Sequence, residues 1–240
     1  MVIDDNMKIV VAKRYGPGDR LHHWVHALCM SLFIYSGMAL YLDDFVFFER
    51  SFISKFHLGL GIFIGAWDFV YYLLFLLLYD RHIKHMIPTP ADIRDLLIIV
   101  LCTLGFLADD KYPEHNFYDE DREVYIKKFH PGQKLLYSAD LLVMLLMGST
   151  GLELAGKDAG ILSFLTSINE PVYFGMDFVF GMTGGTAIRT AHFLMFVYFT
   201  CTTLLHAYMA VLPQNFSNVR GMILGKEKLK KNAFLEKSKS

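Results

Sequence analysis

The stretch HFLMFVYFTCTTLLHAYMA, residues 192–210, has no Lys, Arg, Asp or Glu and carries two histidines 14 residues apart. With its neighbours it forms an apolar segment at 191–212, and roughly 20 such residues suffice to cross about 30 Å of hydrocarbon as a helix. Lipid offers no partners to backbone polar groups, so a spanning segment of this length is helical. The stretch therefore predicts a membrane-spanning helix with a histidine towards each end.

Three further stretches are long and apolar enough to span a membrane, and they cover residues 24–42, 56–79 and 135–154. A shorter run at 96–108 does not reach that length. It follows Thr89 and Pro90, a capping hydroxyl and a proline that together predict the start of a helix. We predict an all-α integral membrane protein, a four-helix transmembrane bundle with an extra interfacial helix between the second and third spans.

Lysine and arginine alternate in number along the segments that the spans separate. There are 4 before the first span, 2 at 43–55, 8 at 80–134, 2 at 155–190 and 7 after residue 212. By the positive-inside rule the N-terminus, the segment 80–134 and the C-terminus are cytoplasmic. The N-terminus lacks the apolar core of a signal peptide, so the first span is expected to be an uncleaved anchor. We expect residues 1–215 to form the four-span domain and residues 216–240 a basic cytoplasmic tail against anionic lipid.

The composition excludes nucleic acid as a partner. Apolar residues make up 54% of the chain, and 23 basic side chains face 24 acidic ones. A nucleic-acid-binding protein would carry a concentrated basic excess. The three cysteines lie far apart, at 29, 102 and 201, which leaves neither a CxxC metal knuckle nor a disulfide framework.

Four of the ten histidines lie at the ends of predicted spans, where ionisable groups are rare and functional by default. They are His23, His57, His192 and His206. A separation of 14 residues is about four helical turns and about 21 Å, so His192 and His206 share a face and lie in different leaflets. In the predicted orientation His57 lies level with His192 and His23 with His206. Two stacked imidazole pairs suit two six-coordinate haems that transfer electrons, because no iron position stays open for oxygen.

The neighbours of His23 leave alternatives open. His22 and His26 lie beside it, and spacing alone does not choose the inner ligand among the three. The run HHWVH also resembles one histidine box of the membrane desaturases and hydroxylases that bind non-haem iron, although this chain has a single such box. For any one span-end histidine, snorkelling or a hydrogen bond at the interface is the plainest alternative. The remaining histidines, at 82, 85, 115 and 130, are expected to be loop residues.

Three glycines lie near these histidines in the sequence, at 37, 59 and 61. Small residues allow helices, or a flat macrocycle, to approach the backbone closely. Plain helix packing explains them equally well.

Polar residues at the cytoplasmic start of the third span point to a further site. Gln133, Tyr137 and Asp140 fall at i, i+4 and i+7 and share one helical face. Asp140 is a candidate for delivering protons to a bound electron acceptor. Asp68, deep in the second span, is a second candidate, and a buried hydrogen bond between helices is its alternative.

The order and spacing of several motifs resemble the di-haem cytochrome b subunits of membrane-bound nickel–iron hydrogenases and of formate dehydrogenases. These motifs are Arg20-Leu21-His22-His23-Trp24 and Ser36-Gly37 in the first span, His57 with Gly61 in the second, Gln133-Lys134 before the third, and the two histidines of the fourth. The ending His206 to Ala210 and the segment Thr183-Gly184-Gly185 look more like the hydrogenase branch.

The resemblance implies two haems b, one held by His57 and His192 and the other by His23 and His206. The family ligand is the histidine before the tryptophan, which favours His23 over His22 and His26. It also implies quinone reduction near the inner haem, with Gln133 in the quinone site, although His130 stands where many relatives have asparagine.

The partners implied are an iron–sulfur subunit and the catalytic subunit of a hydrogenase or, alternatively, of a formate dehydrogenase or another respiratory dehydrogenase. The chain is then a non-catalytic subunit of the respiratory chain in the inner membrane.

Overall fold

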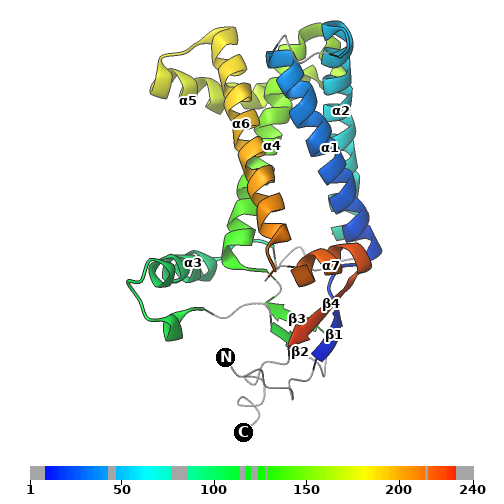
Figure 1. The fold of residues 1–240 in the computed structure, drawn as a ribbon. Coiled ribbons are helices and arrows are strands. Elements are labelled where there is room, and N and C mark those ends of the chain that lie inside the picture. The colour runs from blue at the N-terminus through cyan, green and yellow to red at the C-terminus, as the bar shows by residue number, and fades with distance from the viewer. Residues whose placement is uncertain are drawn as a thin grey trace.

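The computed structural model describes residues 9–42, 47–76, 86–113, 117–119, 124–127, 129–213 and 216–230. Four long helices run side by side in it (Figure 1). They are α1 (Pro17–Tyr41), α2 (Arg50–Val70), α4 (Pro131–Ala155) and α6 (Gly184–Val211). All four are long and apolar enough to cross a membrane. The predicted four-helix transmembrane bundle is confirmed, and the orientation of its termini stays a prediction.

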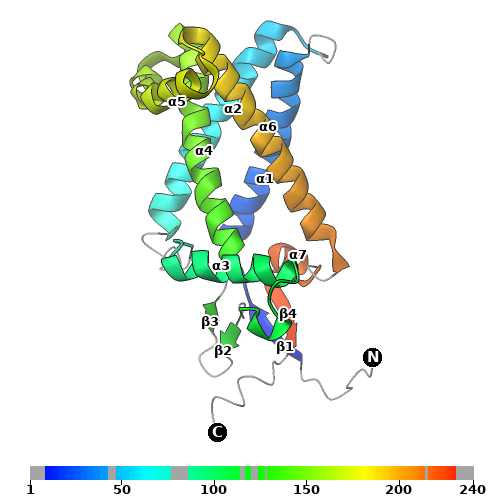
Figure 2. The same cartoon turned by 90° about the vertical axis from the view of Figure 1, so that its left-hand side faces the viewer.

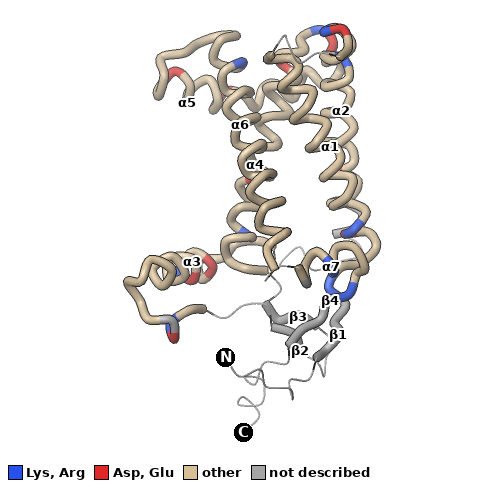
Figure 3. The backbone as a smooth tube through the Cα atoms, in the orientation of Figure 1, with Lys and Arg blue, Asp and Glu red and all other residues tan. Residues whose placement is uncertain are grey.

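Each long helix lies beside two others, since α1 packs against α2, α4 against α6, and contacts also join α1 to α6 and α2 to α4. Figure 3 shows Lys, Arg, Asp and Glu gathered towards the two ends of the bundle, with the middle of the long helices almost free of them. An uncharged band of this kind is what a hydrocarbon layer requires.

Local capping sets where α1 and α4 begin. The Asp19 carboxylate accepts a hydrogen bond of 2.9 Å from the Gly16 backbone N–H, ahead of α1. At α4, His130 Nδ1 accepts from the Gly132 N–H at 3.0 Å and Gln133 Oε1 accepts from the His130 N–H at 3.0 Å. These bonds satisfy N–H groups that a helix N-terminus leaves unpaired. His130, expected to be a loop residue, therefore caps α4, while the histidines at 82, 85 and 115 lie outside the described residues.

The helix α3 (Pro90–Thr103) lies across one end of the bundle, as the views in Figures 1 and 2 agree. Thr89 caps it as predicted, because its hydroxyl oxygen accepts from the Asp92 backbone N–H at 3.4 Å, and Asp92 Oδ2 accepts in return from the Thr89 N–H at 2.8 Å. One face carries exposed apolar side chains, and these are Ile93, Leu97, Val100 and Leu104. An exposed apolar stripe on a helix that does not span suits the boundary between headgroups and acyl chains.

The shorter stretches of the described chain were not foreseen as separate elements. A 3-10 segment η5 (Gly156–Asn169) and helix α5 (Glu170–Phe180) follow α4, and α2 ends in a π-helical segment η2 (Tyr71–Leu76). A short 3-10 turn η4 (Asp109–Lys111) follows α3, and α7 (Phe216–Leu224) follows α6.

Two short antiparallel pairs complete the fold, β1 (Ile9–Lys13) with β4 (Lys226–Lys230) and β2 (Phe117–Asp119) with β3 (Val124–Lys127). Much of the segment expected to be a basic tail thus forms α7 and β4, and residues 231–240 lie outside the described residues.

Candidate functional site

The first histidine pair joins α2 to α6. The ring centroids of His57 and His192 lie 6.4 Å apart. A metal bonded to two opposed imidazole nitrogens at about 2 Å each would separate the ring centres by about 6.3 Å, since a ring nitrogen is about 1.2 Å from its centre. The spacing of this pair therefore fits one iron between the two rings.

Two hydroxyl groups determine which nitrogen each of these histidines offers. The Ser36 hydroxyl donates to the Leu32 carbonyl at 2.7 Å, so its oxygen accepts from His57 Nδ1, 2.8 Å away. The His57 proton is then on Nδ1, and Nε2 keeps a free lone pair.

His192 is arranged in the same way. The Thr150 hydroxyl donates to the Leu146 carbonyl at 2.8 Å and accepts from His192 Nδ1 at 3.0 Å. A metal-ligating histidine almost always has its other nitrogen held by such an outer partner. Both imidazoles of this pair are therefore in the tautomer that can ligate through Nε2.

Glycines make room for these two rings. A methyl group on Gly151 would lie 3.2 Å from His192 Cε1, and one on Gly37 would lie 3.8 Å from His57 Cε1 and 3.2 Å from the Phe196 ring. Gly37 was expected to allow a close approach, whereas Gly151 was missed, although it closes a run of small residues at 148–151. A methyl group added to Gly59 would have no described atom within 4 Å, and one added to Gly61 would lie 3.9 Å from the Phe33 ring.

The second histidine pair joins α1 to α6. The ring centroids of His23 and His206 lie 6.2 Å apart, a spacing that again fits one metal between two imidazoles. The His23 Nδ1 atom is buried without a hydrogen-bond partner among the described residues. Both pairs take one histidine from α6, so one helix contributes to two histidine pairs at different depths.

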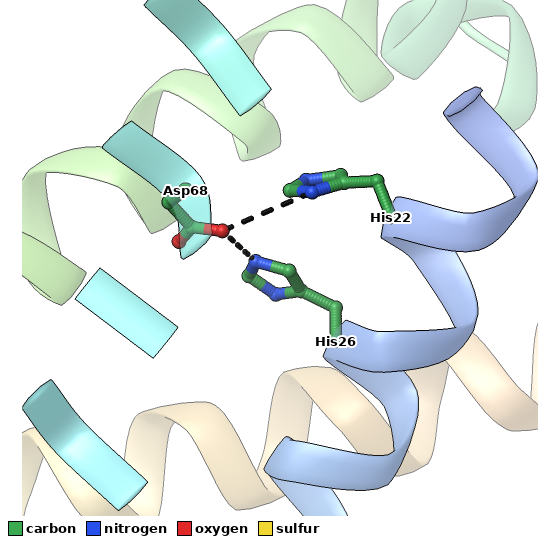
Figure 4. A group of neighbouring side chains, drawn as sticks. All are labelled: His22, His26 and Asp68. Carbon is green, nitrogen blue, oxygen red and sulfur yellow. Dashed lines mark hydrogen bonds and ion pairs between the residues drawn. The ribbon is translucent and has the colours of Figure 1, made fainter. Parts of the chain in front are cut away.

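The other two histidines of α1 turn to a different neighbour. His26 Nε2 lies 2.5 Å from Asp68 Oδ1 on α2 (Figure 4). His22 stacks on the Tyr71 ring, with 3.6 Å between the ring centroids. His22 Nδ1 also accepts a hydrogen bond of 3.1 Å from the Trp67 indole N–H. Of the three candidates that the sequence left open, His23 is therefore the one that the geometry sets opposite His206.

The three residues predicted for a quinone site share α4 but bond to three different neighbours. Gln133 is exposed and caps α4 through His130, and the Tyr137 hydroxyl bonds to the Tyr72 hydroxyl. Asp140 Oδ1 accepts a hydrogen bond of 2.7 Å from the Tyr198 hydroxyl of α6. The partner Tyr198 was missed because α4 and α6 are far apart in sequence. The role of these residues in binding quinone stays a prediction.

An ion pair fixes α3 beside this region. Lys134 Nζ lies 2.8 Å from Asp92 Oδ1, and both side chains are largely buried. Burial alone would raise the pKa of Asp92, but hydrogen bonds from Lys134 and Thr89 outweigh it and hold that pKa below its ordinary value. The carboxylate is therefore charged at neutral pH and anchors α3 to the start of α4.

The chain resembles known proteins in two comparisons. The sequence model of a family described as prokaryotic cytochrome b561 matches residues 14–225, which include all four paired histidines. The F420 non-reducing hydrogenase II cytochrome subunit of Methanosarcina mazei is 27% identical over 220 residues, covering 86% of this chain and 78% of that protein. The family expected from the sequence motifs is thus the kind of family that the comparisons find.

Proposed function

Because the chain belongs to the prokaryotic cytochrome b561 family, we propose that it anchors a hydrogenase complex in the membrane and passes electrons from it to quinone. Its family and its four spanning helices make it a multi-pass membrane cytochrome b that binds haem b and transfers electrons. The hydrogenase partner, the number of haems and the quinone belong to the proposal.

The observation that carries the proposal is that two histidines of α6 each face a histidine of another helix. His57 with His192, and His23 with His206, would each hold one haem b, since the ring spacings of 6.4 and 6.2 Å both fit a bis-imidazole metal. A haem b ligated in this way supplies one-electron redox chemistry with no open iron position. The chain itself supplies the ligands, their orientation through Ser36 and Thr150, and an apolar surrounding.

The direction of flow follows from the predicted orientation. With the termini in the cytoplasm, His57 and His192 lie near the outer surface, where an iron–sulfur subunit would deliver electrons from the hydrogenase catalytic subunit. Gln133 and Tyr137 would bind the quinone near the cytoplasmic face, and Asp140 would hold a proton for it. Oxidation of hydrogen outside with proton uptake inside would then contribute to a proton-motive force across the inner membrane.

A pyridine haemochrome spectrum of the purified full-length protein tests the ligand assignment. We expect two haems b per chain in the native protein and about one after His57→Ala or His206→Ala. His130→Ala is the matched control, because that side chain caps α4, and both haems should remain. One haem in the native protein, or two in either variant, would contradict the assignment.

Copurification tests the partner. Recovery of a nickel–iron subunit with the tagged chain is expected, whereas a formate dehydrogenase subunit would favour the alternative. The chemistry of the electron donor resides on that partner, which is why the 27% identical hydrogenase cytochrome is the observation that favours hydrogen. Non-haem iron without haem would instead support the desaturase alternative.

A further inference from the structure

His22, His26 and Asp68 form a cluster that the two histidine pairs do not use. His22 and His26 are four residues apart on α1, so their imidazoles lie on one face, one helical turn apart. Figure 4 shows both rings turned towards Asp68, which comes from α2. One ligand atom from each of the three side chains lies within 4.8 Å of the other two.

The Asp68 carboxylate is the unusual member of this cluster. Its side chain is 7% exposed, and Oδ1 lies 2.5 Å from His26 Nε2 and 3.9 Å from His22 Nδ1. The other oxygen, Oδ2, is buried and has no hydrogen-bond partner among the described residues. Leaving a buried carboxylate oxygen unpaired is costly, and such an atom is often explained by an ion that occupies the site.

We propose that His22, His26 and Asp68 bind one divalent zinc-type ion, at a site separate from the haem ligands. Two imidazoles and one carboxylate are a standard three-ligand set for Zn²⁺, with water in the fourth position. Magnesium and calcium prefer oxygen ligands only, so two nitrogens disfavour them.

The surroundings of the cluster favour four-coordinate zinc over six-coordinate iron. The same ligand types hold non-haem Fe(II) when three further positions stay open. Here the Tyr71 ring is stacked on His22 with an interplanar angle of 8°, and the Tyr72 ring meets the His22 ring edge-on at 5.7 Å. These aromatic rings pack against His22 and so limit the room on that side of the cluster.

Trp67 gives the site a competitor that can be tested. Its indole N–H donates to His22 Nδ1, the nitrogen that lies nearest Asp68. An ion that binds this nitrogen must displace the indole hydrogen bond. Trp67→Phe removes the competing donor while keeping an aromatic ring, so it should tighten metal binding by about 2- to 10-fold, the equivalent of one hydrogen bond.

A bound ion would connect α1 to α2 at the level of His23, because His22 and His26 lie on either side of that residue in the helix. The ion would thereby restrict rotation of α1 about its axis. The proposed ion would thus join α1 to α2 beside the His23–His206 pair without contacting the haem that this pair would hold.

Zinc binding by the full-length holoprotein in detergent tests the proposal. After treatment with a chelator, the protein is dialysed against micromolar ZnCl₂, and zinc per chain is measured by mass spectrometry of the metal content. We expect one zinc in the native protein and at least a tenfold loss of affinity in Asp68→Asn and in His26→Gln. Asp177→Asn, the same change at an exposed carboxylate of α5, should bind zinc as the native protein does.

Several outcomes would overturn the proposal. These are no zinc in the native protein, equal zinc in Asp68→Asn, or a preference for Fe²⁺ over Zn²⁺ in the same dialysis. The haemochrome measured on each sample separates a lost site from a lost fold. If a ligand variant loses haem as well as zinc, Trp67→Phe decides, because tighter binding supports the site and unchanged or weaker binding overturns it. Missing haem with intact zinc binding would count against the proposed electron-transfer function alone.

Discussion

At the scale of single residues, hydroxyl groups set the basicity and orientation of His57 and His192. Ser36 and Thr150 each use their own hydrogen on a backbone carbonyl and so can only accept from an imidazole. An accepted Nδ1–H makes the opposite nitrogen more basic and fixes the plane of the ring. Neither contact follows from local sequence, because each joins two different helices.

Ser36→Ala should raise the midpoint potential of one haem and leave the other unchanged. Without the acceptor, His57 becomes a less basic ligand and stabilises the oxidised iron less well. A potentiometric titration of the haem absorbance checks this. Ser31→Ala is the control, because among the described residues the Ser31 hydroxyl bonds to the Ala27 carbonyl of its own helix and to no histidine. Two unchanged potentials in Ser36→Ala would contradict the role given to this hydroxyl.

Gly151→Ala should reduce the haem content from two to about one. The added methyl group would lie 3.2 Å from His192 Cε1, so the ring must give way by a few tenths of an ångström, and we expect this shift to weaken its alignment with His57. Gly148→Ala, one turn earlier on α4, is matched to it, because no described atom lies within 4 Å of the methyl group there. Equal haem content in the two variants would show that the ring has other room.

Asp140→Asn should slow hydrogen-driven quinone reduction by at least tenfold with both haems retained. The amide can still accept from the Tyr198 hydroxyl but cannot deliver a proton, and positioned acid–base groups typically contribute 100-fold or more. The rate in membranes that contain the whole complex is the measurement. Unchanged turnover would exclude Asp140 as the proton donor.

At the scale of elements, α3 depends on one ion pair. Asp92→Asn should loosen α3 from α4, because Lys134 loses its charged partner in a largely buried setting. A hydrogen bond to a charged group contributes about 1.5–3 kcal/mol, equivalent to roughly 10- to 100-fold in local opening. Trypsin cleavage after Arg94, whose side chain is 71% exposed, should accelerate accordingly. Asp110→Asn, in the exposed pair with Lys111, should leave the cleavage rate nearly unchanged.

The same pair predicts a dependence on pH. The pKa of Asp92 is lower in the folded protein than in the unfolded chain. Its contribution to the stability of the α3–α4 contact is therefore fully present at a pH above its ordinary pKa of about 3.9. This stabilising contribution is lost as the pH falls through the lower pKa that Asp92 has in the folded protein. Pepsin digestion of α3 should therefore accelerate in the native protein below about pH 4 and stay fast across that range in Asp92→Asn.

The sequence predicted elements whose signal is local and missed those whose signal is not. Length and apolar composition determine a span, so α1, α2, α4 and α6 were foreseen. The run that forms α5 is only 11 residues long, which composition does not separate from a loop. The β1–β4 pair joins segments more than 200 residues apart, and its register has no counterpart in either segment alone.

The candidate site was predictable to the same extent. Spacing on α6 placed His192 and His206 on one face, whereas choosing His23 over His22 and His26 required the orientation of α1 about its axis. Asp68 was noted as a buried carboxylate, but its two histidine neighbours emerge only when α1 and α2 are packed together.

At the scale of the whole molecule, the two ends of the described chain lie on the same side of the membrane-spanning bundle. The four spans are an even number, and β1 pairs with β4, so the two ends of the described chain lie side by side (Figure 1). The positive-inside rule predicts that this side is cytoplasmic.

A fluorescent protein fused to the C-terminus should fold and fluoresce, because that end is expected to be cytoplasmic, while alkaline phosphatase fused there should be inactive. Fusions after residue 157, in the segment between the third and fourth spans, should behave in the opposite way and serve as the control. The reversed pattern would overturn both the orientation and the proposed proton-motive role.

The two histidines on α6 fix the number of residues that can separate them in a functional helix. An insertion of one residue between His192 and His206 turns one ring by about 100° relative to the other, from about 40° on one side of alignment to about 60° on the other, and an insertion of about four residues brings both rings back to one face. With four residues inserted the rings are about 6 Å further apart, so the partners on α1 and α2 would have to move as well. Substitutions can therefore accumulate on α6 among relatives, whereas insertions and deletions between the two histidines should be absent from functional chains.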